Sequence, residues 1–300
     1  MLFRRLVASQ SATQVTRHCR TFLTRKTEIS KPPEYYEGRL EGTAPEHDCY
    51  ILLHASESPE LFPKVHKTSL SLELQSRASK WGGIVNFSWF NDVSSKASME
   101  RGVQPATVFS RLGGKLEIPD ISFENIDQVE RTIQAHLEGP PMSTKGTQPD
   151  NDMHIYVCTH GLRDCRCGER GKQVYSALVE AVNDVRRREP SGLANNIKIG
   201  EVGHVGGHKY AANVLIYPQG EWLGIVRTED APSIIAQALE SLKQGVKPLD
   251  ATAPPTSISH WRGRMGLSKE EQKNLWAKHA GIESQDTLVK DKELRPMARA

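Results

Sequence analysis

Two short segments rich in cysteine and histidine stand out in this sequence: Cys158-Thr-His-Gly-Leu-Arg-Asp-Cys-Arg-Cys167 and Gly203-His-Val-Gly-Gly-His208. The rest of the chain holds only two other cysteines, Cys19 and Cys49. Thiolates and imidazoles are the side-chain groups that bind soft and borderline metals. The sequence therefore predicts a metal site built from both segments.

Each of these segments follows a stretch with the character of a buried strand. The apolar run 154–157 precedes the first segment, and the run 197–202 precedes the second, with a helical pattern between them. Open α/β sheets bind their ligands beyond the carboxyl ends of their strands. We therefore expect the two segments to meet there, with Cys165 and Cys167 in a loop before the helix.

The same order of elements occurs in both halves of the chain. Residues 45–138 read as strand, helix, strand, hairpin and helix, and residues 153–245 repeat that order. The expected elements of the first half are 49–54, 70–81, 84–90, 107–111 with 115–118, and 126–137. We predict an α/β fold with two thioredoxin-like lobes.

Segments outside the two lobes have different compositions. Residues 139–152 are rich in proline and glycine and read as a linker. Residues 256–300 read as a helical tail, in which a capping box from Ser268 to Glu271 starts a helix. The apolar residues of this tail are expected to pack on a lobe.

Charge is unevenly distributed along the chain, which has a formal net charge of +3. The first 26 residues carry six basic and no acidic residues, which leaves 33 basic against 36 acidic residues in the remainder. This segment is also rich in serine and threonine and has the composition of a mitochondrial transit peptide. We predict a transit peptide over residues 1–30 and infer no nucleic-acid-binding surface.

Composition also excludes two other classes of protein. The longest apolar runs fall far short of the roughly 20 residues that cross a bilayer, so no membrane span is predicted. Five cysteines without regular spacing argue against a secreted disulfide framework and favour a reducing compartment. Cys49 reads as a core residue, and Cys19 lies within the predicted transit peptide.

The sequence resembles the sucrase/ferredoxin-like family over roughly residues 45–245. The resemblance is sharpest in Cys158-x8-Cys167, in His160-Gly-x-Arg-Asp164 and in the run from Gly203 to Asn213. It implies that the C-terminal lobe is a thioredoxin-like [2Fe–2S] ferredoxin. We find no pair of carboxylates that would support sugar hydrolysis, despite the word sucrase in the family name.

The resemblance also implies a set of cluster ligands. All-cysteine ferredoxins of this fold place two cysteines in the second segment, whereas this chain has His204-x3-His208 and so matches the bis-histidinyl, fungal mitochondrial branch. Carried over position by position, the ligands of the [2Fe–2S] cluster are Cys158, Cys167, His204 and His208. His160 is expected to support the site, and Cys165 is given no ligand role.

Two alternatives remain open from the residues alone. Two cysteines and two histidines also make a tetrahedral zinc set, which would give a zinc-stabilised structural or binding module. A thiol–disulfide oxidoreductase using Cys165 is the other, although the chain has no Cys-x-x-Cys motif.

The favoured function is that of a mitochondrial redox protein, located in the matrix or the intermembrane space. We expect it to transfer electrons or sense redox state, and an electron carrier is favoured over an enzyme with its own substrate. Its expected partners are a redox partner protein and the mitochondrial import and iron–sulfur assembly machinery.

Overall fold

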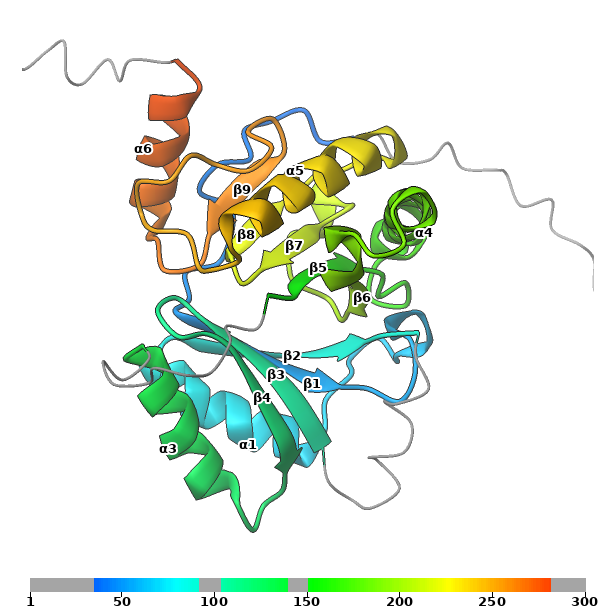
Figure 1. Ribbon diagram of the computed structural model, residues 1–300. Helices are drawn as coiled ribbons and strands as arrows, with labels where there is room; N and C mark the ends of the chain where they lie inside the picture. The colour runs from blue at the N-terminus through cyan, green and yellow to red at the C-terminus, as the bar shows by residue number, and fades with distance from the viewer. Residues whose placement is uncertain (1–34, 92–103, 140–150, 282–300) are drawn as a thin grey trace, which may run out of the picture. The chain divides into compact units, whose positions relative to one another are not determined.

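The computed structural model describes residues 35–91, 104–139 and 151–281 (Figure 1). The predicted transit peptide at 1–30 lies outside these residues, as do most of the predicted linker at 139–152 and the last 19 residues of the predicted tail. Within the described residues, no helix is both long enough and apolar enough to cross a membrane.

A nine-stranded sheet runs through the described chain in the order β4-β3-β1-β2-β6-β5-β7-β8-β9. Its strands are β1 (Cys49–His54), β2 (Gly83–Trp89), β3 (Gln104–Ser110), β4 (Gly114–Ile121), β5 (Met153–Cys158), β6 (Ile197–Val202), β7 (Val214–Tyr217), β8 (Glu221–Leu223) and β9 (Trp261–Arg264).

The two lobes have the same strand topology. In the N-terminal lobe, β1 pairs in parallel with β2 and antiparallel with β3, which pairs with β4. In the C-terminal lobe, β5 has the same relation to β6 and β7, and β7 pairs with β8. This repetition confirms the predicted thioredoxin-like order. The lobes join where Ser88 and Trp89 of β2 pair antiparallel with Val202 and Glu201 of β6.

Helices cover one face of each half of the sheet (Figure 1). In the N-terminal lobe, α1 (Ser69–Ala78) and α3 (Ile126–Leu137) bury apolar side chains against β1 and β3. In the C-terminal lobe, α4 (Cys165–Arg188) and α5 (Ala231–Gln244) do the same against β5 and β7. Burial of these apolar faces supplies the main stabilisation of each lobe.

A third apolar cluster lies on the opposite side of the sheet, because alternate residues of a strand point to opposite faces. Tyr50 and Leu52 of β1, and Tyr156 and Cys158 of β5, belong to this cluster. Cys158 therefore points away from the core beneath α4 and α5, which includes its neighbour Val157.

The C-terminal tail differs in part from the prediction. Its helix α6 (Lys269–His279) begins with the predicted capping box, and Trp261, Leu267 and Leu275 are buried in the core of the C-terminal lobe. The tail also contains strand β9, which the prediction of a helical tail missed. The Arg-Gly-Arg part of β9 has no apolar alternation, and it is buried because Glu221 pairs with Arg264.

Helix α4 begins earlier than predicted. Cys165 and Cys167 were expected in a loop, but α4 starts at Cys165. Asp164 caps this helix by accepting a hydrogen bond from the backbone N–H of Arg166, at 3.1 Å. The apolar helical pattern begins only at Val174, and the glycines at 168 and 171 allow the first turns of the helix to approach the preceding loop closely.

Candidate metal centre

Strand β5 places Cys158 at the carboxyl end of a parallel pair of strands. Its backbone N–H donates to the carbonyl of Asn213 at 3.1 Å, and the residue is fully buried. An added Cβ on Gly171 would lie 2.1 Å from the carbonyl oxygen of Cys158. Glycine at 171 is therefore needed for helix α4 to pack this close to the first cysteine.

Cys167 lies in the first turn of α4, three residues after the capping aspartate. Its N–H donates to the carbonyl of Asp164 at 3.1 Å, and the residue is fully buried. Successive helical residues are turned by about 100°, so residues two apart point to nearly opposite sides. This explains why Cys165 is exposed while Cys167 points inward.

His204 follows β6 in a segment held by the N-terminal lobe. The N–H of Gly203 donates to the carbonyl of Phe87 at 2.9 Å, and the N–H of His204 donates to Nδ1 of His160 at 3.3 Å. The other ring nitrogen of His160 lies 2.9 Å from the carbonyl of Pro63, so it is the donor there. His160 thus connects the two lobes and supports the backbone of His204.

The side chains of Cys158, Cys167 and His204 converge. One ligand atom from each lies within 4.8 Å of the other two, and Sγ of Cys167 is 3.9 Å from Nδ1 of His204. The structure thus brings together three of the four residues that the sequence predicted as ligands. These three come from β5, α4 and the segment after β6.

His208, the fourth predicted ligand, lies beside this group. Its ring centroid is 5.8 Å from that of His204, with an angle of 29° between the ring planes. Its Nδ1 is 3.8 Å from a carboxylate oxygen of Asp164, and its side chain is 49% exposed. His208 is therefore the predicted ligand with the most access to solvent.

The pKa values of the two buried thiols shift in opposite directions. A hydrogen bond from Cys167 lowers the pKa of Cys158, although burial of Cys158 opposes this effect. The same hydrogen bond raises the pKa of Cys167, and burial raises it further. One thiolate is thus stabilised without a metal, whereas both thiols must lose their protons when a metal binds.

Arg262 of β9 is a residue at the site that sequence reasoning missed. It is 2% exposed and forms no ion pair within the described residues. Its Nη1 donates to Oδ1 of Asn213 at 2.7 Å, and an added Cβ on Gly207 would lie 2.7 Å from its Nη2. Burial lowers its pKa to about 10, so it stays charged at neutral pH.

This cation complements the thiolates. Negative charge on Cys158 and Cys167 acts to raise the pKa of Arg262, against the larger effect of burial. A buried charge is costly unless an opposite charge lies nearby. No motif could have identified Arg262, because it lies 54 residues beyond His208 and reaches the site only through β9.

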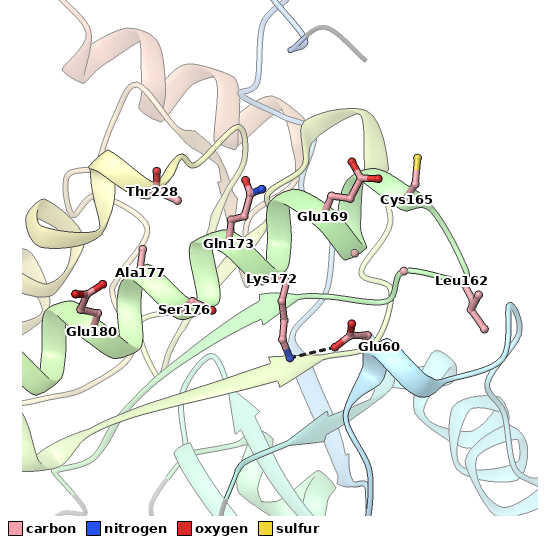
Figure 2. A pocket seen from close by; sticks show the side chains of 12 residues that line it. Glu60, Leu162, Cys165, Glu169, Lys172, Gln173, Ser176, Ala177, Glu180 and Thr228 are labelled. Atoms are coloured by element: carbon pink, nitrogen blue, oxygen red, sulfur yellow. Dashed lines mark ion pairs between the residues drawn. The ribbon is translucent and has the colours of Figure 1, made fainter. Parts of the chain in front are cut away.

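Cys165 lies outside this convergence, at the start of α4 (Figure 2). It lines an open groove of about 870 Å³ together with residues of the outer face of α4. Lys172 in this groove forms ion pairs with Glu60 at 3.3 Å and with the buried Glu201 at 2.9 Å. The four cysteines among the described residues, Cys165 included, are free thiols.

Sequence comparison identifies the relatives of the chain. Residues 40–250, which contain all four predicted ligands, match the family described as sucrase/ferredoxin-like. The chain belongs to the sucrase/ferredoxin-like family. This family match covers both lobes and confirms the resemblance seen in the motifs.

Curated members of similar sequence are fungal proteins. Altered inheritance of mitochondria protein 32 of Meyerozyma guilliermondii is 32% identical over 135 residues, which are 44% of this chain and 43% of that protein. Actin patches distal protein 1 of Saccharomyces cerevisiae is 31% identical over 156 residues, which are 50% of this chain and 43% of that protein. The chain thus matches less than half the length of each relative.

A solved structure with a local likeness is a thioredoxin-like [2Fe–2S] ferredoxin from Aquifex aeolicus. It is 23% identical and covers 32% of this chain and 89% of its own, with a TM-score of 0.25. The assignment to the sucrase/ferredoxin-like family therefore rests on the sequence match.

Proposed function

We propose that this chain is a [2Fe–2S] redox protein whose cluster is held by Cys158, Cys167, His204 and His208. The observation that carries the proposal is the convergence of two fully buried thiols and one imidazole within 4.8 Å. This convergence occurs at the carboxyl ends of parallel strands, in a chain of the sucrase/ferredoxin-like family.

The chemistry of the donor set fits such a cluster. Two hydrogen-bonded cysteines form one pair, and two histidines with facing rings form the other. Two irons need two such pairs of protein ligands, and replacing a cysteine pair by histidines is known in Rieske centres. We infer that the cysteine pair holds one iron and the histidine pair the other.

The cluster would supply reversible one-electron chemistry, and the surrounding residues control access to it. The complete burial of Cys158 and Cys167 keeps water from their sulfur atoms. The exposed His208 offers the route by which an electron reaches a partner protein. Asp164, 3.8 Å from His208, orients this histidine and links it to the first turn of α4.

The charge of the site sets the expected reduction potential. Two thiolates and two neutral imidazoles leave an oxidised [2Fe–2S] centre uncharged, whereas four thiolates leave it with a charge of −2. Less negative charge favours reduction, so we expect a potential in the Rieske range of about −150 to +300 mV. The buried cation of Arg262 acts in the same direction.

A redox titration followed by optical spectroscopy tests this proposal. We expect the wild-type potential to lie above about −150 mV, and we expect His208→Cys to lower it because a third, negatively charged thiolate replaces a neutral ligand. Lys209→Cys, which adds a thiol one residue away, is the matched control and should leave the potential unchanged. A wild-type potential near that of plant-type ferredoxins, about −400 mV, would contradict the ligand set.

We further propose a mitochondrial location, in the matrix or the intermembrane space. The composition of residues 1–30 supports it, and so do relatives whose names refer to mitochondrial inheritance. The expected partners are a redox partner protein and the machineries for import and for iron–sulfur assembly. Fractionation of cells that express the chain with and without residues 1–30 tests the location, because only the full chain should enter mitochondria.

Zinc is a second candidate for the site, favoured by one observation. Three ligand atoms within 4.8 Å of one another also suit a single tetrahedral ion. A zinc protein would be colourless and inactive in redox titrations. Analysis of bound metal and sulfide distinguishes the two candidates.

A further inference from the structure

A cleft between the two lobes opens beside the predicted ligand His204. Its volume is about 480 Å³, within the range of small-molecule sites in proteins. Its walls come from the segment before α1, from β2 and from the two ligand-bearing segments. The edge of the metal centre therefore forms part of the wall of this cleft.

Buried aromatic side chains form the floor of the cleft. Tyr50, Phe62, Phe87 and Trp222 all line it. His66 stacks on Phe62 with a centroid distance of 3.8 Å and an interplanar angle of 7°, and burial lowers the pKa of this histidine. The imidazole of His66 is thus a neutral ring that extends the aromatic wall.

Three cations line the same cleft: Lys64, Lys67 and Arg163. All three are exposed, and none forms an ion pair within the part of the chain that the structure describes. No aspartate or glutamate is among the described residues that line the cleft. Glu57 interacts with His66 electrostatically but is not part of the lining.

Apolar side chains also remain exposed in the cleft. Val65 is 60% exposed and Leu72 is 50% exposed, although both line it. Exposed apolar surface rimmed by polar residues is typical of ligand-binding grooves. The walls are concave and come from both lobes, which suits a small molecule better than a flat protein surface.

We propose that this cleft binds a small organic anion with an apolar or aromatic body. The body would lie against the exposed side chains of Val65 and Leu72 and the half-buried ring of His66. The anionic group would face Lys64, Lys67 and Arg163. Because His204 lines the same cleft, a bound anion would place negative charge beside the metal centre. Negative charge at this position would make the cluster harder to reduce. This effect on reduction rests on the proposed function.

Binding is tested with a matched pair of probes on the full chain. The anionic probe is 1-anilinonaphthalene-8-sulfonate, and the neutral probe is N-phenyl-1-naphthylamine, which has the same rings without the sulfonate. Calorimetric titration should show that the anionic probe binds at least about tenfold more tightly, and that added salt removes most of the difference.

Charge-reversal variants locate the site. Lys64→Glu combined with Lys67→Glu should weaken binding of the anionic probe by at least about tenfold, and should leave the neutral probe unaffected. Lys278→Glu, a reversal at an exposed lysine of α6, is the control and should change neither affinity. Circular dichroism of each variant checks that it is folded.

Two results would overturn the cleft as an anion site. One is equal affinity for the charged and the neutral probe. The other is anionic binding that persists in the Lys64/Lys67 variant, which would place the probe elsewhere. If a colourless, zinc-loaded protein binds the probes as expected, the anion site is supported and the proposed cluster is rejected. The two proposals can therefore fail separately. In an iron–sulfur protein, the anionic probe should lower the reduction potential.

Discussion

Arg262 of β9 donates a hydrogen bond of 2.7 Å from Nη1 to Oδ1 of Asn213. The side-chain N–H of Asn213 in turn donates to the carbonyl of Gly207 at 3.2 Å, within the segment that carries both histidines. The C-terminal tail is thereby connected to the metal centre. Arg262 has two effects to separate, because it supports the ligand segment and adds a buried positive charge.

Substitution of Arg262 separates these effects. Arg262→Gln removes the charge and should lower the reduction potential, because the positive charge that favours an added electron is lost. Arg262→Lys keeps a positive charge but loses the planar fork of donors. Its reduction potential should therefore stay close to the wild-type value, while the cluster should be lost faster on heating. Arg188→Gln, at an exposed position near the end of α4, is the control. Equal potentials in wild type and Arg262→Gln would contradict an electrostatic role.

Cys165 and Cys167 should respond differently to substitution by serine. Cys167 points into the ligand group, whereas Cys165 points to solvent. We expect Cys165→Ser to retain the optical spectrum of the cluster, and Cys167→Ser to lose it. Each variant serves as the other's control for the cost of placing serine in the first turn of α4.

Any loss of thiol-linked redox activity in Cys165→Ser, with the spectrum intact, would favour the thiol–disulfide oxidoreductase. Loss of the spectrum in this variant would instead mean that Cys165 is a ligand.

Gly171→Ala should separate α4 from the end of β5. Alanine normally stabilises a helix relative to glycine by about 1 kcal/mol. Here its Cβ would lie 2.1 Å from the carbonyl oxygen of Cys158, and backbone must move to relieve that contact. We expect a net loss of about 1–3 kcal/mol in the free energy of unfolding and weaker metal retention. Ser176→Ala, on the exposed face of α4, is the control, and a stabilised Gly171→Ala would refute this packing.

Much of the fold could be predicted because its elements have local signals. The apolar run at β1 and the capping box of α6 fix their positions within a residue or two. Repetition of one element order in both halves was visible for the same reason. The predicted start of α4 was too late because the apolar pattern of this helix begins only at Val174, whereas Asp164 caps it at Cys165.

The rest depends on contacts between distant residues. Strand β9 carries little strand signal, and it forms because Glu221 accepts hydrogen bonds from Trp261 and Arg264. Convergence of the cysteines with His204 followed from motif spacing and from the shared end of two strands. A supporting role for His160 was predicted from the sequence, but its contacts with the backbone of His204 and the carbonyl of Pro63 need both lobes in place and could not be predicted.

His47 should make the protein less stable as the pH falls. It is 4% exposed, and its Nδ1–H donates to the carbonyl of Pro45 at 2.8 Å. Burial lowers its pKa from 6.5 to about 4. Between these values the unfolded chain binds a proton that the folded chain excludes, so stability is lost as the pH falls from 6.5 towards 4.

The contribution of His47 over this range is on the order of 3 kcal/mol. Urea unfolding at pH 7, 5.5 and 4.5 measures it. His47→Gln should flatten the pH dependence, whereas His279→Gln, at an exposed position of α6, should not. An unchanged slope in His47→Gln would show that this histidine does not exclude the proton.

The most direct measurement of the central claim is the iron, sulfide and zinc content of the anaerobically purified chain, combined with EPR before and after reduction. We expect two irons and two sulfides per chain, little zinc, and an EPR signal that appears on one-electron reduction. Serine variants of Cys158 and Cys167 should lose the iron, the sulfide and the EPR signal. Colourless protein with one zinc per chain and no sulfide would contradict the claim that this site holds an iron–sulfur cluster.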